Sequence, residues 1–229
     1  MVQYGPKSAS EYLLEHGFMP ESTKSTAVAE LTFEVDKSDR FFDDKADVLE
    51  FETGGAPIEP VQAFDLVAAP GKDGQPDPAL MQFLRLAKLG NTDAFLLESI
   101  FRKEVWGFMA YPVSEKNERE VIDAIISACN DALKEKDEIN DALIDETNSK
   151  DELMSKNKRA CATLRGIERR ALQRTLEYVQ REEEALDLKE YYQERRLKDL
   201  GLNSPWDGDE NNADVGWGAR KPGDGGLDW

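Results

Sequence analysis

The sequence is poor in histidine and cysteine. His16 is the single histidine, and Cys129 and Cys161 are the two cysteines among 229 residues. One histidine cannot build a histidine-rich metal site, and two cysteines are too few for a disulfide framework. We therefore expect no metal centre, a reducing compartment, and both cysteines buried as small apolar residues in helices.

Long apolar runs and an excess of positive charge are also missing. No stretch approaches the roughly 20 apolar residues of a membrane span, and the first residues resemble neither a secretory signal nor a transit peptide. The net charge of −18 excludes a general nucleic-acid binder, because phosphate contacts require clustered Lys and Arg. We expect an intracellular protein that binds neither membranes nor nucleic acids.

Motifs of self-contained catalytic centres are absent from the sequence as well. It contains no CxxC pair, no HExxH, no phosphate-binding P-loop and no nucleophile elbow. The acidic runs, such as Glu182 to Glu184, have the pattern of solvated helix faces. The residues taken by themselves therefore indicate no complete active site.

Capped amphipathic patterns predict helices along most of the chain. The first covers residues 8–18, with Ser8 or Ser10 as its cap and Gly17 at its end. Others are predicted at residues 41–51, 77–90, 93–103 and 114–136, followed by one very long helix over about residues 150–192. Residues 20–30 read as a polar connector, and alternation predicts short strands at 31–35 and 63–68. The fold class is mainly α.

Apolar residues recur on one face of the two longest predicted helices. In the first they are Val121, Ile122, Ile125, Ile126, Cys129 and Leu133. In the second, Ala160, Leu164, Ile167 and Ala171 form a coiled-coil-like seam, which Cys161, Leu172, Leu176 and Val179 widen into a stripe for packing against several helices.

The second of these helices is locally basic in an acidic protein, and its basic residues include Lys158, Arg165 and Arg169. Two interpretations remain open. The basic residues pair with acidic neighbours on a solvated face, or they form a docking surface for an acidic partner.

The last residues, 203–229, are rich in Gly, Asp and Asn and hold three of the four tryptophans. Their composition predicts a disordered tail, since it cannot offset the entropy of ordering. The tail is either without a binding role or carries a short linear motif built on its Trp residues.

Three stretches resemble one known family. Residues 4–21, YGPKSASEYLLEHGFMPE, resemble the end of the SET domain in the Rubisco large-subunit lysine methyltransferase family. The middle region, with DKADVLEF, DPALMQFLRLAKL and SEKNEREVIDAIISACNDAL, resembles that family's helical substrate-binding domain; its marks are Leu84-Arg85 and Asn117-Glu118. Residues 162–202 are similar to the terminal helix of algal and plant members.

The resemblance implies a specific domain organisation. Residues 1–20 would be the C-terminal remnant of a SET domain, and residues 31–202 the all-helical Rubisco-methyltransferase substrate-binding domain, followed by the tail at 203–229. The Asn-His-Ser-type cofactor motif and the glycine-rich first strands of a SET domain do not occur in the sequence. We therefore expect most of the catalytic core to be missing.

The resemblance also implies methyl transfer from S-adenosyl-L-methionine to a protein side chain, usually lysine. Tyr4 would be the catalytic residue that lines the lysine channel, and His16, Gly17 and Phe18 would lie against the cofactor. Such a transfer depends mainly on positioning in a polar, water-poor channel. The partner would be a protein substrate that docks on Lys158, Arg165 and Arg169. The chain would be a monomer in the chloroplast or cytoplasm. An alternative interpretation remains open for two of these residues. Tyr4 is then an ordinary surface tyrosine, and Phe18 is a core residue at the end of the helix.

Two positions depart from the family pattern. Ala9 stands where the family has Asn, and His16 stands where it has a second tyrosine. The position of His16 also varies in relatives that methylate histidine, so both lysine and histidine remain open as the acceptor.

Three hypotheses follow. The chain is the substrate-docking part of a protein-lysine methyltransferase that is inactive by itself, a stand-alone helical protein-binding module without catalysis, or a coiled-coil scaffold. We expect it to bind a protein partner and to show no methyltransferase activity alone.

Overall fold

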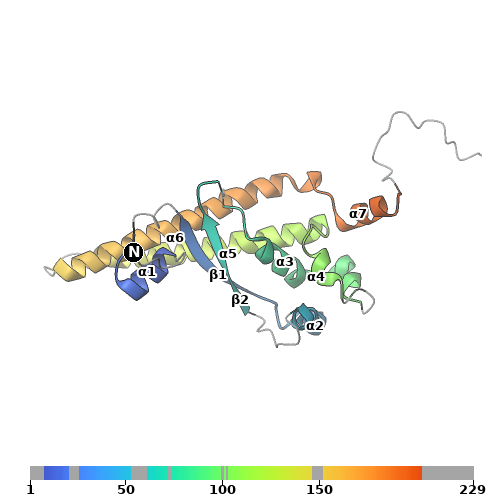
Figure 1. Ribbon diagram of the computed structural model, residues 1–229, viewed down its shortest axis with the longest axis horizontal. Helices are drawn as coiled ribbons and strands as arrows, with labels where there is room; N and C mark the ends of the chain where they lie inside the picture. Colours follow the sequence, from blue (N-terminus) through green and yellow to red (C-terminus); the bar gives the residue numbers. More distant parts are fainter. Residues whose placement is uncertain are drawn as a thin grey trace, which may run out of the picture. The chain divides into compact units, whose positions relative to one another are not determined.

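The computed structural model describes residues 8–20, 26–52, 61–71, 74–98, 101, 103–145 and 152–202. The chain divides into two units, residues 1–192 and 193–229, and each is described by itself. The described part of the first unit contains helices α1 to α6 and a two-stranded sheet (Figure 1). The mainly α expectation is confirmed, although the domain is not entirely helical.

The first helix, α1 (Ala9–His16), forms where the sequence predicts it. Ser8 Oγ accepts a hydrogen bond from the Glu11 amide at 3.2 Å, and the Glu11 carboxylate accepts one from the Ser8 amide at 2.6 Å. This capping box satisfies two amides that have no partner inside the helix. The helix ends at Gly17, whose φ of 73° is left-handed and whose amide donates to Leu13 O at 3.0 Å.

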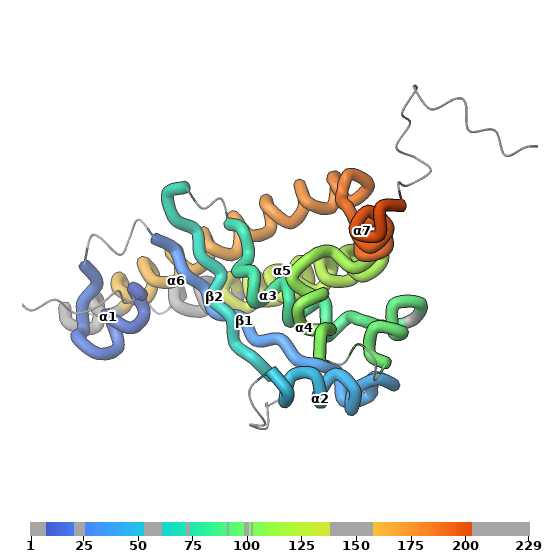
Figure 2. Tube along the Cα trace, turned by 45° about the vertical axis from the view of Figure 1, so that its right-hand side comes forward, coloured from blue at the N-terminus to red at the C-terminus, as the bar shows by residue number. Residues whose placement is uncertain are grey.

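The sheet pairs two strands that are distant in sequence. β1 (Ala27–Glu34) lies antiparallel to β2 (Val61–Ala68), with Ala27 opposite Ala68 and Glu34 opposite Val61. Both strands pack on α6, as the views in Figures 1 and 2 show. The strand predictions are confirmed, but the polar connector is wrong over residues 27–30. There the small side chains of Ala27 and Ala29 are buried, a contact that apolar periodicity does not reveal.

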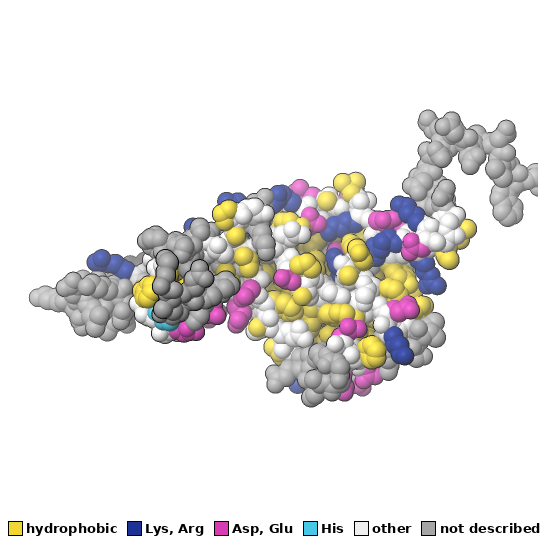
Figure 3. Space-filling model, viewed as in Figure 1, with side chains coloured by type: hydrophobic (Ala, Val, Ile, Leu, Met, Phe, Trp, Pro, Cys, Tyr) yellow, Lys and Arg dark blue, Asp and Glu magenta, His cyan; other side chains and the backbone are white. Residues whose placement is uncertain are grey.

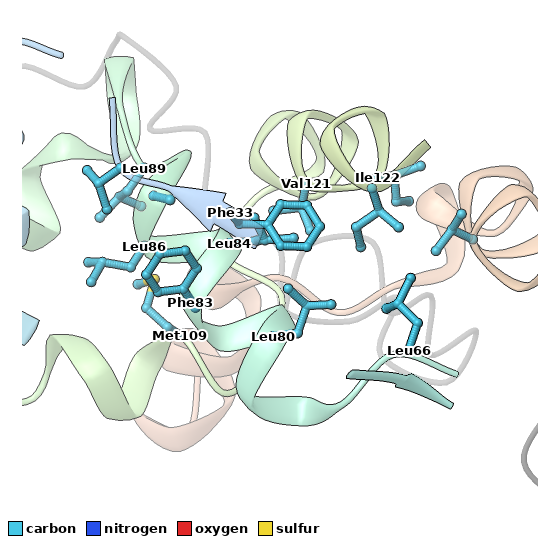
Figure 4. Packing of buried hydrophobic residues seen from close by; sticks show 14 of the residues in the cluster. Phe33, Leu66, Leu80, Phe83, Leu84, Leu86, Leu89, Met109, Val121 and Ile122 are labelled. Atoms are coloured by element: carbon cyan, nitrogen blue, oxygen red, sulfur yellow. The ribbon is translucent and has the colours of Figure 1, made fainter. Parts of the chain in front are cut away.

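The short helix α3 (Pro78–Ala87) occupies the centre of the core. Asp77 caps it by accepting from the Ala79 amide at 2.7 Å, and Pro78 stands in its first turn, as predicted. Figure 4 shows its apolar side chains converging with those of the sheet and of α5; the labelled residues are Phe33, Leu66, Leu80, Phe83, Leu84, Leu86, Leu89, Met109, Val121 and Ile122. Burying each such side chain stabilises the fold by about 1.5–3 kcal/mol.

Two long helices, α5 (Glu115–Asp145) and α6 (Glu152–Glu184), run side by side (Figure 1). They are antiparallel, because Arg119 lies 3.7 Å from Glu183 whereas Lys136 lies 2.6 Å from Glu168. The predicted stripes face inward: Val121, Ile122, Ile125, Cys129, Ile167, Ala171 and Leu172 are buried. Cys161 is exposed, so its expected burial is wrong. The buried residues of α6 lie further along the helix, from Ile167 to Val179.

Buried Lys45 fixes α2 (Phe42–Glu52) to the end of α3. Its ammonium lies 2.6 Å from the Asp39 carboxylate and donates to Ala87 O at 2.8 Å. Burial lowers the pKa of Lys45, while the Asp39 carboxylate opposes that shift. The helix at 41–51 is confirmed, and its lysine is a core residue.

The segment after α3 departs from the prediction. Residues 93–103 were expected to form an α-helix, but the chain forms the 3₁₀ helix η2 (Asn91–Leu97) and then the single turn α4 (Val105–Phe108). Gly90, before η2, has no side chain with which to cap it. Aromatic packing dominates instead, since Phe95, Phe101 and Phe108 gather with Tyr192 at centroid distances of 5.1–6.3 Å.

The final predicted helix is interrupted. α6 ends at Glu184 and is followed by the 3₁₀ turn η3 (Leu186–Leu188), so one continuous helix to Tyr192 is wrong. The break lets Leu186 become buried and the Tyr192 amide donate to Val113 O at 3.1 Å. α7 (Tyr192–Asp199) belongs to the second unit from its second residue onward, and it is followed by Gly201, whose φ is 69°. The predicted tail at 203–229 lies outside the described residues.

Among the described residues, none of the helices is long and apolar enough to cross a membrane.

Candidate functional site

The residues expected beside the cofactor follow the first turns of α1. His16, Gly17 and Phe18 form the end of this helix, which lies beside α6 (Figure 2). The rings of Tyr12, His16 and Phe18 gather at centroid distances of 5.8–6.3 Å. Phe18 is 55% exposed, and Leu14 on the same helix is 86% exposed. The segment therefore presents an aromatic and apolar surface to the outside of the described chain. Tyr4 lies outside the described residues.

The residues expected to dock a partner lie along α6. Lys158, Arg165 and Arg169 are all half-buried. The Arg169 guanidinium is paired with the Asp137 carboxylate of α5, and the adjacent residues Lys136 and Glu168 form a second ion pair at 2.6 Å. These two crossed ion pairs hold α5 against α6. Arg169 thus has the acidic neighbour that we expected if the basic residues pair within the protein. Its role in docking a partner stays a prediction.

A buried charged network lies at the other end of the helical pair. Arg85 Nε donates to Glu118 Oε1 at 2.5 Å and Arg85 Nη2 donates to Glu118 Oε2 at 3.2 Å, while Arg85 Nη1 donates to Met109 O at 3.0 Å. Asn117 Nδ2 donates to Arg85 O at 3.1 Å. The network unites Leu84-Arg85 with Asn117-Glu118, the two pairs that mark the resemblance in the sequence.

Lys189 extends this network to the surface. Its ammonium lies 3.6 Å from Glu118 Oε2 and 2.9 Å from Glu182 Oε2. Glu118 is fully buried, whereas the Glu182 side chain is 37% exposed. Burial and the neighbouring Glu182 carboxylate also raise the pKa of Tyr178, which stands one turn before Glu182 on α6.

A cleft of about 260 Å³ opens beside these charges. Its walls come from the start of α3, from α5, from the end of α6 and from the segment after η3, and they include Pro78, Met81, Arg85, Ile122, Tyr178, Val179, Glu182 and Lys189. Figure 3 shows hydrophobic side chains reaching the surface between side chains of both charges on the face that carries α3. Sequence reasoning missed this cleft. The one available signal was a charged Arg85 within the apolar run LMQFLRLAKL.

The remaining titratable groups of the described residues show neither a metal-ligand cluster nor a reactive cysteine at Cys129. No group of three or more His, Cys, Asp or Glu side chains there could hold a metal ion. Burial raises the pKa of the Cys129 thiol to about 12, so it does not act as a nucleophile at neutral pH. The described part of the chain thus offers surfaces and ion pairs to a partner.

Comparison with known proteins decides the family. Residues 36–172 match the family described as Rubisco LSMT substrate-binding. The chain belongs to this family. The resemblance found in the sequence is therefore confirmed, and the matched region holds strand β2, the Arg85–Glu118 pair and most of the helical pair.

The similar curated proteins are plant methyltransferases. The chain is 40% identical over 209 residues to "[Fructose-bisphosphate aldolase]-lysine N-methyltransferase, chloroplastic" of Arabidopsis thaliana, a match that covers 88% of this chain. It is 39% identical to the ribulose-1,5 bisphosphate carboxylase/oxygenase large subunit N-methyltransferase of Nicotiana tabacum and 37% identical to that of Pisum sativum. It spans about 40% of the length of these relatives.

Solved structures give the same result. The SET domain of LSMT bound to MeLysine and AdoHcy is 36% identical, with a TM-score of 0.68, over 89% of this chain and 45% of that chain. Rubisco LSMT bound to AdoMet is 36% identical, with a TM-score of 0.67, over 86% of this chain and 44% of that chain. S-adenosyl-L-methionine is thus the cofactor of the family.

Proposed function

We propose that this chain is the substrate-docking part of an S-adenosylmethionine-dependent protein-lysine N-methyltransferase. The observation that carries the proposal is the family match over residues 36–172, together with 40% identity to a lysine methyltransferase across 88% of the chain. Because relatives act on the Rubisco large subunit or on fructose-bisphosphate aldolase, we propose one of these chloroplast proteins as the partner, and lysine as the acceptor.

Within this proposal residues 1–20 are the last segment of a SET domain. The exposed Leu14 and Phe18 support it, because an apolar helix face of this kind suits packing against a further part of a protein. The described residues from α1 to Phe18 fit one aromatic contact with the cofactor, through Phe18, and do not fit a complete cofactor site. Tyr4, His16 and Gly17 are proposed to stand beside that contact. We propose that the 229 residues alone do not transfer a methyl group.

Docking is proposed to use Lys158, Arg165 and Arg169 on α6. These residues are positively charged in a chain whose net charge is −18. They would therefore bind an acidic patch on the partner protein. The alternative function, a stand-alone helical binding module without catalysis, shares this surface. It is favoured by the charged network and cleft, which are complete within the described residues.

Binding of the 229-residue chain to Rubisco holoenzyme and to fructose-bisphosphate aldolase, measured by biolayer interferometry, tests the proposal. We expect one of the two to bind, and Lys158→Glu with Arg165→Glu to weaken that binding about 10-fold. Arg119→Glu, which reverses an exposed charge on α5, is the matched control.

Arg169 requires a separate design because it also pairs with Asp137. Arg169→Glu combined with Asp137→Arg restores an ion pair between the helices while moving the positive charge to α5. Weakened partner binding with unchanged unfolding temperature would support a docking role for Arg169. Titration calorimetry with S-adenosylmethionine then separates the two functions: saturable micromolar binding would contradict the proposed inactivity of the chain.

A further inference from the structure

The cleft beside the Arg85–Glu118 pair is small. Its volume of about 260 Å³ lies below the roughly 300–1,000 Å³ of pockets that hold drug-sized ligands. Apolar groups from Pro78, Met81 and Val179 line it together with the half-buried ring of Tyr178. This combination suits one long side chain with an apolar stem from a protein or peptide.

The two positively charged side chains of the cleft already form ion pairs with carboxylates of the protein. The Arg85 side chain is 8% exposed, and its guanidinium donates to both Glu118 oxygens and to Met109 O. Lys189 is 17% exposed and lies between two carboxylates, Glu118 and Glu182. An incoming carboxylate would meet these same two carboxylates, and like charges at such distances repel.

The carboxylate of Glu182 is the accessible charge of the cleft. It is 37% exposed, whereas Glu118 is fully buried. If a second cation takes Glu182, Lys189 keeps Glu118, 3.6 Å away, as a partner. The acidic run 182–184 and the net charge of −18 add attraction for a positive group.

We propose that this cleft binds an Arg or Lys side chain of a partner protein, whose stem packs on Met81, Tyr178 and Val179 and whose cation pairs with Glu182. Lys189 holds the place of that cation until the partner arrives. The inference rests on the proposed docking function, since it assigns the cleft to the protein substrate, and it adds a second contact of opposite charge to the one on Lys158 and Arg165.

Titration of the ¹⁵N-labelled 229-residue chain with two peptides, acetyl-Leu-Arg-Leu-amide and acetyl-Leu-Glu-Leu-amide, tests the proposal by NMR. We expect the Arg peptide to shift the amide signals of Tyr178, Val179 and Glu182 in a saturable way. Glu182→Gln should weaken its binding about 5-fold, as loss of a charge-assisted hydrogen bond at a part-exposed site predicts. Lys189→Gln should strengthen it about 2-fold or more, because a competing cation is removed.

Glu184→Gln is the matched control, since it removes the same charge from α6 outside the cleft lining, and it should change the affinity less than 2-fold by screening of an exposed charge. The proposal is overturned if the Glu peptide binds more tightly, if Lys189→Gln weakens the Arg peptide, or if neither peptide shifts these signals. If Rubisco and aldolase do not bind but the Arg peptide does, the proposed function is contradicted and the proposal for the cleft is supported. If the Glu182→Gln variant binds either protein as tightly as the wild type does, the proposed role of the cleft is contradicted and the proposed function is retained.

Discussion

Arg85 and Glu118, 33 residues apart in the sequence, form a buried bidentate ion pair beside the cleft that Arg85 helps to line. Arg85 is 7% exposed and Glu118 0%. The pair joins the end of α3 to the first turn of α5. Taking two charges out of water is costly, so each depends on the other to remain buried.

Removal of one partner of this pair should be strongly destabilising. Arg85→Met leaves Glu118 buried with only Lys189 nearby, and we expect a loss of about 3–5 kcal/mol in the free energy of unfolding. Urea denaturation measures it. The double variant Arg85→Met with Glu118→Leu should lose clearly less than the sum of the single changes, since no charge is left unpaired. Arg119→Met, at an exposed pair on α5, should cost less than about 1 kcal/mol. Additive losses would contradict the coupling.

Replacement of Gly74 by alanine should be more destabilising than replacement of Gly71. Its φ of 78° is left-handed, and a Cβ there would meet the Arg174 carbonyl group and lie 2.7 Å from the Thr175 amide nitrogen, both backbone of α6. Gly71 has a similar φ of 82° but no atom within 4 Å of such a Cβ. We therefore expect Gly71→Ala to cost about 1–2 kcal/mol from strain, and Gly74→Ala about 2 kcal/mol more from overpacking. Equal unfolding free energies in the two variants would refute the close approach.

The Asp39–Lys45 pair predicts an acid-dependent stability. Burial raises the pKa of Asp39, but hydrogen bonds from Lys45 and the Phe41 amide outweigh it, and the pKa falls below its usual 3.8. The unfolded chain then binds more protons just below pH 3.8. The stability from this carboxylate is therefore complete above about pH 5 and is lost as pH falls through the folded-state pKa.

Asp39→Asn tests this dependence. It should cost about 2 kcal/mol at pH 7, where it removes a charge-assisted bond to Lys45. The difference between wild type and variant should shrink as pH falls from about 5 to 3. Asp43→Asn, an exposed carboxylate in the first turn of α2, serves as the control. A difference that stays constant or grows toward acid would show that Asp39 has no lowered pKa.

Local chemistry made much of the fold predictable. Ser8 and Asp77 cap their helices, and Gly17 ends α1, because capping depends on a few neighbouring residues. The stripe from Val121 to Cys129 is buried because a helix repeats every 3.6 residues whatever it packs against. The failures had a non-local origin. At η2 and after Glu184, aromatic and apolar contacts with distant residues overrode helical propensity.

The sequence alone therefore determined most of the helices, the core of both strands and the family, because caps, periodicity and marked residue pairs depend on residues close together along the chain. Only the tertiary structure decided which charges are buried. Lys45, Arg85 and Glu118 look in the sequence like any charged residue of a solvated helix, yet all three lie in the core. Whether a charge meets water or a partner depends on segments far away in the chain. For the same reason, Arg169 was read from the sequence with both roles open, and its pairing with Asp137 became visible once α5 and α6 lay together.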